Sequence, residues 1–473
     1  MRKRQYLATV LALGLMGAGG LMGCGDDDGG DGTPDSGRVD GGNDPVDGGG
    51  DENDGGNTPE CGEQGETTVS GDISTNTTWT CANEYRLTAP VFVTNNAVLT
   101  IEPGTRILGD DGSHLVITRG ARLVADGTAE APIVFTSSRA EGSRGRGDWG
   151  GVVLLGRAPI NVEGGEDNIE GLPATEERGV YGGTDAAHNC GTLRYVRVEY
   201  AGDVIGEDNE LNGLTLGACG TGTVVDYVQV HNGLDDAFEM FGGTVNLRHV
   251  VASSMDDDGL DWDQGYTGSV QFAIIQRGNS SSADPNGIEA DNLRASPAAA
   301  PISEPTVYNL TVVGANNAAV TNSVGMVLRR GTHGHIFNAI VVGFGEAGVE
   351  IPATVDPDGD GPLPAIPDPS AAAAASGDLE VENSIFFNNG VAFSSGAAQT
   401  AFSMAGAMNQ TETNPMLSMP YNLTAPNFAP AAALTSGAAT PAGTGIDATA
   451  TFIGAIRDAA SDWTQGWTAY PAE

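Results

Sequence analysis

One short pattern of polar and apolar positions occurs three times in the middle of the chain. Each copy has a turn-forming Asp or Asn, a small residue, a large apolar residue and an acid, and the copies are Asp236–Glu239, Asp258–Asp261 and Asn286–Glu289. Side chains along a β-strand point alternately to its two faces. Each copy therefore predicts a short strand whose apolar residue points inward and whose acid points outward.

The spacing of these copies indicates a stacked-repeat fold. The first two begin 22 residues apart and the next two 28 residues apart, which is close to the length of one coil. Fainter copies lie at 212–215, 325–327 and 348–350. Stacked coils would place the following residues in one outer row: Thr215, Glu239, Asp261, Glu289, Val327 and Glu350. We call Glu239, Asp261 and Glu289 the acidic row.

Short runs of β-branched and aliphatic residues fill most of the remaining chain, and helical periodicity is absent. Runs such as 228–230, 250–252 and 274–276 each precede an acid-bearing strand. We therefore expect an all-β chain that folds as a right-handed parallel β-helix, a solenoid with two strands per coil, over residues 61–438. Loop insertions or local disorder are expected at 158–189, 277–285, 295–305 and 352–377, the last of which contains an AAAAAS tract.

The C-terminal residues 439–473 are expected to cap the open end of the stack. An uncovered sheet end exposes unpaired backbone groups, and Trp463 and Trp467 are large enough to cover them. The alternative is that the two indole rings stack on a sugar.

Several segments resemble a family of exported bacterial parallel β-helix proteins, many of which are lipoproteins. The segments are IEPGT, GDWGG, NGLDDAFEMFGGTVN, DDDGLDWDQGY, NGIEADN and DWTQGWT, and the resemblance covers roughly residues 65–473. It implies a β-helix in the cell envelope. It brings no catalytic residues with it.

The N-terminus has the pattern of an export signal. Residues 1–23 have a basic start and an apolar run that ends in Leu-Met-Gly, and Cys24 follows. This resembles the bacterial lipoprotein signal, which implies that Cys24 is lipidated and tethers the protein to a membrane. Gly25, the residue after the lipidated cysteine, favours placement in the outer membrane. The alternative to a lipoprotein signal is an ordinary signal peptide or a transmembrane anchor. Residues 24–60 are rich in Gly and Asp, which predicts a disordered linker.

Charge and cysteine content narrow the partners and the compartment. The formal net charge is -41, which opposes nucleic acid binding and favours divalent cations. Four cysteines remain besides Cys24, an even number that suits disulfides in an exported protein. Proximity in the chain favours Cys61 with Cys81 and Cys190 with Cys219, although two other pairings are open.

The acidic row is the candidate functional site. Neighbouring strands lie about 4.8 Å apart, so equivalent carboxylates on successive coils would raise one another's pKa or recruit a cation. Calcium suits such oxygen ligands. The predicted ligands are Asp236, Glu239, Asp258, Asp261, Asp263, Glu289 and Asp291. A hydrogen-bonded ladder of turn residues and a catalytic cluster are the alternatives.

A catalytic version would use the same row. Glu239, Asp261 and Glu289 could supply the paired carboxylates of a retaining glycosidase. In a calcium-dependent polysaccharide lyase, a fold analogy only, Arg329 would be the base, because it occupies the position equivalent to Asp291. His231 is a second candidate base. Residues 356–361 resemble the start of a calcium loop, but Pro367 at the twelfth position excludes a complete EF-hand.

Together these patterns predict a lipid-anchored protein of the cell envelope whose acidic row binds calcium, a glycan or both in a structural or adhesive role. Its expected partners are the membrane, through the lipid, and a polysaccharide or a surface protein. The alternative is a calcium-dependent polysaccharide lyase or glycosidase. Mutating the acidic row distinguishes the two, because only the enzyme would lose turnover.

Overall fold

The computed structural model describes residue 61 and residues 65–471, with gaps at 207–208, 279, 281, 283–284, 318–319, 358–362 and 395. The predicted signal peptide, the lipid site at Cys24 and the linker up to residue 60 lie outside the described residues, as does most of the 356–361 loop. Among the described residues, no helix has the length and the hydropathy needed to cross a bilayer.

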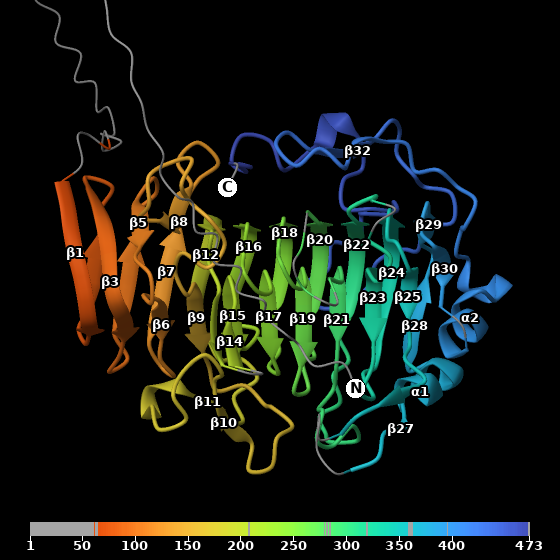
Figure 1. Ribbon diagram of the computed structural model, residues 1–473, viewed down its shortest axis with the longest axis horizontal. Coiled ribbons are helices and arrows are strands. Elements are labelled where there is room, and N and C mark those ends of the chain that lie inside the picture. Colours follow the sequence, from red (N-terminus) through yellow and green to blue (C-terminus); the bar gives the residue numbers. More distant parts are fainter. Residues whose placement is uncertain are drawn as a thin grey trace, which may run out of the picture. The chain divides into compact units, whose positions relative to one another are not determined.

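The body is a parallel β-helix, as the repeat predicts (Figure 1). One sheet of 24 strands winds through it, and every strand pairs in parallel with the equivalent strand of the next coil. Its first coils contain β1 (Gly65–Ile73), β2 (Thr77–Trp79), β3 (Asn83–Val93), β4 (Val98–Ile101), β5 (Arg106–Gly109), β6 (Leu115–Ile117), β7 (Arg122–Asp126) and β8 (Ile133–Ser137).

Each later coil has one long and one short strand. The long strands are β12 (Gly191–Glu199), β16 (Val224–His231), β18 (Asn246–Ser253), β20 (Ser269–Gln276), β22 (Thr306–Val313) and β24 (Gly334–Val342). The short strands are β9 (Val152–Leu155), β15 (Leu214–Gly217), β17 (Phe238–Phe241), β19 (Leu260–Asp263), β21 (Ile288–Ala290), β23 (Val324–Leu328) and β25 (Ala347–Glu350). The stack ends with β28 (Leu379–Glu382), β29 (Ile385–Phe387) and β30 (Val391–Phe393).

Among the described residues, four small two-stranded sheets lie in the insertions and near the C-terminus. They are formed by β10 (Glu166–Asn168) with β11 (Val180–Gly182), β13 (Asp203–Gly206) with β14 (Asn209–Leu211), β26 (Thr354–Val355) with β27 (Ile366–Pro367), and β31 (Leu417–Met419) with β32 (Asn427–Pro430). All four are antiparallel. They therefore decorate the solenoid without lengthening it.

The interior is filled by the apolar residues that the repeat predicts. Phe238, Leu260 and Ile288 are directly paired on adjacent short strands and are fully buried. The row continues in both directions with Leu214, Met326 and Val349, which are also fully buried. Because each coil adds only a few such side chains, a chain with 6% aromatic residues can still fill a long core.

The long strands bend at one residue that has a left-handed backbone. In four successive coils this residue is Tyr195, Tyr227, His249 or Phe272, with φ between 46° and 61°. Bulky side chains rarely adopt such angles. Here the rings stack in a column, with centroids 4.5, 4.2 and 4.8 Å apart, and this stacking offsets the strain. No local pattern in the sequence predicts this column.

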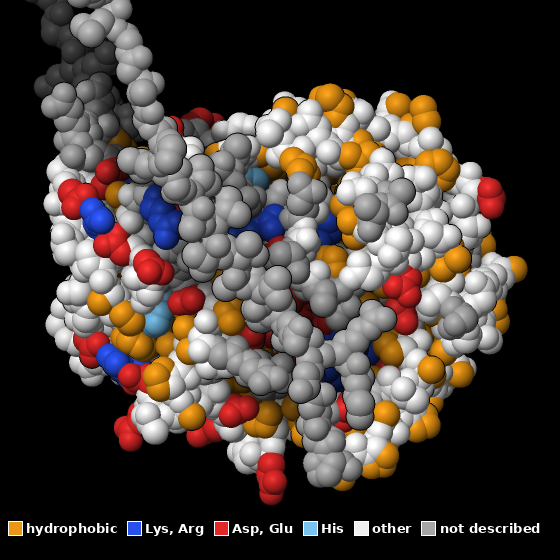
Figure 2. All heavy atoms as spheres, viewed as in Figure 1, with side chains coloured by type: hydrophobic (Ala, Val, Ile, Leu, Met, Phe, Trp, Pro, Cys, Tyr) orange, Lys and Arg blue, Asp and Glu red, His pale blue; other side chains and the backbone are white. Residues whose placement is uncertain are grey.

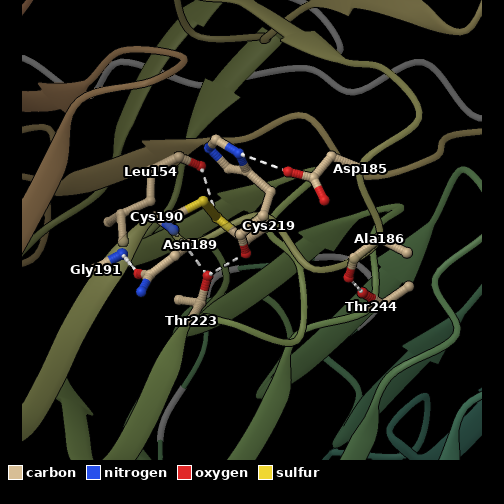
Figure 3. Close-up of a disulfide and its surroundings, with 10 residues drawn as sticks. Leu154, Asp185, Ala186, Asn189, Cys190, Gly191, Cys219, Thr223 and Thr244 are labelled. Carbon is tan, nitrogen blue, oxygen red and sulfur yellow. Dashed lines mark hydrogen bonds and ion pairs between the residues drawn. A yellow bond between two sulfur atoms is a disulfide. The ribbon is translucent and has the colours of Figure 1, made fainter. Parts of the chain in front are cut away.

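Both expected disulfides form. Cys61 is bonded to Cys81, and Cys190 to Cys219. The second bond is fully buried within the core (Figure 3), where the Cys219 Sγ lies 3.6 Å from the Leu154 carbonyl oxygen. Nearby, the Thr223 Oγ1 accepts a hydrogen bond from the Cys190 N–H at 2.9 Å. This disulfide therefore fastens the end of the 158–189 insertion to the solenoid.

Two short helices cover the C-terminal end of the stack. The AAAAAS tract, expected to be a loop or disordered, is helix α1 (Ser370–Ser376), and it packs against α2 (Ala397–Phe402). Ala373, Ala398 and Phe402 are buried in the main core. A run of alanines has high helix propensity, and here tertiary packing stabilises a helix too short to be stable alone.

Residues 439–471 do not cap this end. Residues 416–471, which we call the strap, run back along the outside of the long strands towards β12 (Figure 1). Trp467 is 1% exposed and its ring packs edge-on against Tyr195 and Tyr227. The expectation of an end cap at residues 439–473 is therefore wrong in position. A sugar-stacking role for Trp467 is also excluded, because its ring is buried.

Side-chain amides of the long strands hold the strap in place. Gln229 donates to the carbonyl of Ala469 and accepts from its N–H, at 2.8 and 2.9 Å. Asn338 binds Ala439 in the same two-way manner, at 3.0 and 2.8 Å. Gln271 does so with Asp447, at 3.1 and 2.7 Å. Each amide thus substitutes for a neighbouring strand and satisfies backbone groups of the strap.

Candidate acidic cation site

The acidic row forms in the register that the repeat predicts. Glu239 pairs directly with Asp261, and Asp261 with Glu289, on the adjacent strands β17, β19 and β21. The row continues to Thr215 on one side and to Val327 and Glu350 on the other. Carboxyl groups from three successive coils therefore lie side by side on the outer face of the short-strand sheet.

The row is largely buried, in contrast to the open outer surface that the sequence analysis expected. Glu239 is 8% exposed, whereas Asp261 and Glu289 are half-buried. The neighbouring Asp236, Asp258 and Asp291 are 7%, 3% and 3% exposed. On the preceding coils the same sheet face is apolar and is covered by the 158–189 insertion, which packs Ile160, Ile169, Leu172 and Tyr181 onto it. Tyr181 also donates a hydrogen bond to Gln264 at 2.6 Å, one residue beyond β19.

The turn residues before the short strands form a hydrogen-bonded ladder. The Asp236 Oδ1 accepts from the Asp258 N–H at 2.7 Å, and the Asp258 Oδ1 accepts from the Asn286 N–H at 2.9 Å. The Asn286 Oδ1 accepts in turn from the Val324 N–H at 3.3 Å. Asp236 and Asp258 therefore each use one oxygen to connect neighbouring coils.

Arginines neutralise one end of the cluster. The Arg329 Nε lies 2.9 Å from the Asp291 Oδ1, and the same guanidinium contacts Glu289. Arg330 contacts Asp291 as well. Burial lowers the pKa of Arg329 to about 10, so this side chain remains protonated near neutral pH. Arg329 lies where the register predicts, but its place in ion pairs argues against a role as a free base.

The carboxylates in the middle of the cluster are less completely neutralised by positive charge. Burial, followed by the Asp291 charge, raises the pKa of Asp261 to about 8 against the opposing effect of Arg329 and Arg330. Burial also raises the pKa of Glu239, Asp258 and Asp263 well above the usual range. By contrast, acids and arginines lie next to one another on the first coils (Figure 2), where ion pairs such as Arg106 with Glu84 form.

Several oxygens in this region are buried without a hydrogen-bond donor among the described residues. They are one carboxylate oxygen each of Asp261 and Asp263, and the amide oxygen of Asn212. Asn212 is 1% exposed and its amide nitrogen donates to Glu239. Unsatisfied buried acceptors are costly, and several in one place indicate a missing positive partner.

The carboxylates converge closely enough to share a cation. Three sets each have ligand atoms within 4.8 Å of one another: Asp235, Asp236 and Asp257; Asp236, Glu239 and Asp261; Asp258, Asp261 and Glu289. Calcium binds oxygen at about 2.3–2.6 Å, so two ligands of one ion lie at most about 5 Å apart. The donor set is entirely carboxylate and amide oxygen, which fits calcium better than zinc.

A comparison with family models identifies the family of the chain. The model of the pectate-lyase-like β-helix domain matches residues 71–468, which is nearly the whole described body. The chain belongs to this family. Searches of curated proteins and of solved structures returned no match.

The pectate-lyase-like body contains site residues that the sequence analysis did not list as ligands. Asn212 is the first residue of the fainter copy at 212–215, and Arg330 follows Arg329 at a left-handed position that no pattern marks. Asp235 and Asp257 immediately precede the predicted ligands Asp236 and Asp258. The repeat offers a signal for both Asn212 and Asp235, since Asn212 occupies its turn position and Asp235 lies directly before that position.

His231 does not belong to the acidic site of this pectate-lyase-like fold. Its Nδ1 lies 2.8 Å from the Ser253 Oγ, and its Nε2 lies 2.9 Å from the Pro471 carbonyl oxygen in the strap. His231 is the last residue of β16 and its side chain faces the strap, whereas the carboxylates of the acidic site lie beyond the next turn. The hypothesis that His231 is a base at the acidic site is therefore wrong.

Proposed function

We propose that the acidic row and the turn ladder bind a divalent cation, calcium by its chemistry, and that the protein uses this site to hold an acidic polysaccharide. The observation that carries the proposal is the convergence of carboxylate oxygens from the acidic row and the preceding turns, among which one oxygen of Asp261 is buried without a donor among the described residues. Bound calcium would neutralise these groups and offer open coordination positions to sugar carboxylates.

The residues have separate tasks in this proposal. Asp236 and Asp261 each belong to two of the three converging sets. Asp261 also lies between Glu239 and Glu289 in the acidic row, which makes it the central ligand. Asp236 and Asp258 each hold the turn with one oxygen, which leaves the other for the cation. Arg329 and Arg330 neutralise Glu289 and Asp291 and so limit the cation site to the middle of the cluster. Family membership supports a polysaccharide as the ligand class.

A second candidate function is cleavage of the polysaccharide, which family membership favours. Asp261 has a pKa raised to about 8, so it would be protonated near neutral pH without a cation, as a general acid requires. Glu239 or Glu289 on the adjacent strands would be the second carboxylate. The engagement of Arg329 in ion pairs favours a glycosidase over a lyase within this alternative.

Calorimetric titration of the full chain carrying Cys24→Ser, which removes the lipid site, tests the cation. We expect saturable calcium binding that Asp261→Asn abolishes and that Glu346→Gln, the loss of an exposed acid, leaves unchanged. Absence of a calcium-dependent heat in the unmutated site would overturn the proposal.

The polysaccharide is tested with polygalacturonate as the probe. We expect calcium-dependent retention of the protein on the immobilised polymer, without release of reducing ends. Reducing ends that disappear with Asp261→Asn would support the glycosidase. Unsaturated products would support a lyase.

We also propose that the protein is anchored to the cell envelope through a lipid on Cys24, which the LMGC pattern supports. Cell fractionation and acyl labelling of the unmodified chain and of Cys24→Ser test this. We expect membrane association and label in the first and neither in the second. Membrane association that survives Cys24→Ser would contradict the anchor.

A further inference from the structure

The two ends of the β-helix are covered differently. Helices α1 and α2 close the C-terminal end, and their apolar residues are buried in the main core. The other end consists of β1 (Figure 1) and β2, and among the described strands only β3 pairs with β1 and only β4 with β2. One edge of β1 therefore presents backbone N–H and C=O groups that no described strand satisfies.

The interior rows of the core also end at β1. Thr67, which lies over the buried Tyr85, is exposed. Val69 and Ile73 are half-buried, although Leu87 and Val93 beneath them are fully buried. The apolar core thus reaches the end of the stack without the coverage that it has elsewhere.

Strand β1 also lacks the residues that usually prevent edge pairing. Its sequence, GETTVSGDI, has no Lys, Arg or Pro, and Thr, Val and Ile favour strands. Its two acids point to the outside of the solenoid. There Glu66 lies 3.9 Å from Arg86, and Asp72 pairs with Arg178 at 2.5 Å. Charge repulsion between two such edges is therefore reduced.

We propose that the β1 end is a docking surface for a second copy of this chain. The two β1 strands would pair antiparallel across a two-fold axis and join the two cores. Because the helices close the other end, such pairing gives a closed dimer and not a filament.

The preceding part of the chain is a poorer occupant of this edge. Residues 25–60 contain only two apolar residues, Val39 and Val46, together with three prolines and many Gly and Asp residues. These residue types are depleted in strands, and proline removes a backbone donor. A second copy supplies a strand of matching composition and covers the ends of the interior rows.

Molar mass by light scattering of the full chain carrying Cys24→Ser tests the dimer. We expect twice the mass of one chain, and loss of the dimer in Thr67→Lys, which places a charge between the two cores. Thr411→Lys, which adds the same charge at an exposed threonine away from β1, is the matched control and should remain dimeric. A single-chain mass without the substitutions, a dimer that survives Thr67→Lys, or larger assemblies would overturn the proposal.

Hydrogen exchange of the protein with an unsubstituted β1 keeps the test independent of folding defects. We expect amides of β1 to become protected as the protein concentration rises, while those of β22 stay unchanged. Protection of β1 that does not depend on concentration would overturn the proposal. Both measurements are made without calcium, so failure of the proposed cation site would not affect them.

Discussion

Asp236 and Asp258 carry out a structural and a candidate functional task with the two oxygens of one carboxyl group. One oxygen accepts a backbone N–H from the next coil. The other is available to a cation. Asn can perform the structural task, because its side-chain oxygen also accepts a hydrogen bond. Asn286 does so in the next coil.

The two tasks of Asp258 can be separated by mutation. Asp258→Asn keeps the acceptor for the Asn286 N–H, so we expect its unfolding free energy in chelator to equal or exceed that of the parent protein. Asp258→Ala leaves this buried donor unpaired and should cost about 1–3 kcal/mol relative to Asp258→Asn. Denaturant unfolding measures the difference, and equal stabilities of the two variants would refute the ladder. Both variants should bind calcium more weakly.

Asp261 is expected to destabilise the fold when it is ionised without a cation. Burial raises its pKa to about 8, whereas an unfolded Asp titrates near about 3.9. Asp261→Asn should therefore raise the unfolding free energy in chelator at high pH, by on the order of 1 kcal/mol or more. The gain should vanish at about pH 3 or below, where Asp261 is largely protonated in both states. Glu346→Gln, which removes an exposed acid, should show no such pH dependence.

At the scale of elements, the strap depends on contacts that no local pattern encodes. Gln229 and Ala469 are 240 residues apart, and Asn338 and Ala439 are 101 apart. The sequence predicted the repeat because the period is written in neighbouring residues. The sequence could not predict the path of the strap, because the side-chain amide of a Gln or Asn can bind the backbone of many different segments equally well.

Removing one amide should loosen the strap locally. Gln229→Ala leaves the N–H and C=O groups of Ala469 without their partners, and we expect the local opening free energy of residues 463–471 to fall by about 1–3 kcal/mol. Hydrogen exchange measures this loss of protection. Gln465→Ala, which removes an exposed amide of the strap itself, is the control. Equal exchange in the two variants would show that aromatic packing, not the amides, holds the strap.

The burial of the candidate site also could not be predicted from the sequence. The period correctly placed Glu239, Asp261 and Glu289 side by side, because strand register follows from the apolar row. Their exposure depends on the insertion and on turns from other coils, which are tertiary contacts. Arg329 was placed correctly in the register, yet its ion pairs with Glu289 and Asp291 depend on side-chain conformations that a one-dimensional pattern does not contain.

For the whole molecule, the raised pKa values determine how stability varies with pH. A carboxyl group whose pKa is higher in the folded protein binds protons more tightly there, so the unfolding free energy is greatest at low pH and falls as pH rises through the interval between the two values. For Asp261 this interval runs from about 4 to about 8. A cation that binds only the ionised, folded site reverses the fall.

The melting temperature of the Cys24→Ser chain, measured in calcium and in chelator at about pH 5 and near the Asp261 pKa of about 8, tests the central claim most directly. We predict that in chelator the protein melts at a lower temperature at the higher pH, and that calcium raises the melting temperature there by clearly more than at the lower pH. The Asp261→Asn variant should lose most of this difference. Melting temperatures that are the same in calcium and in chelator at the higher pH would contradict the account.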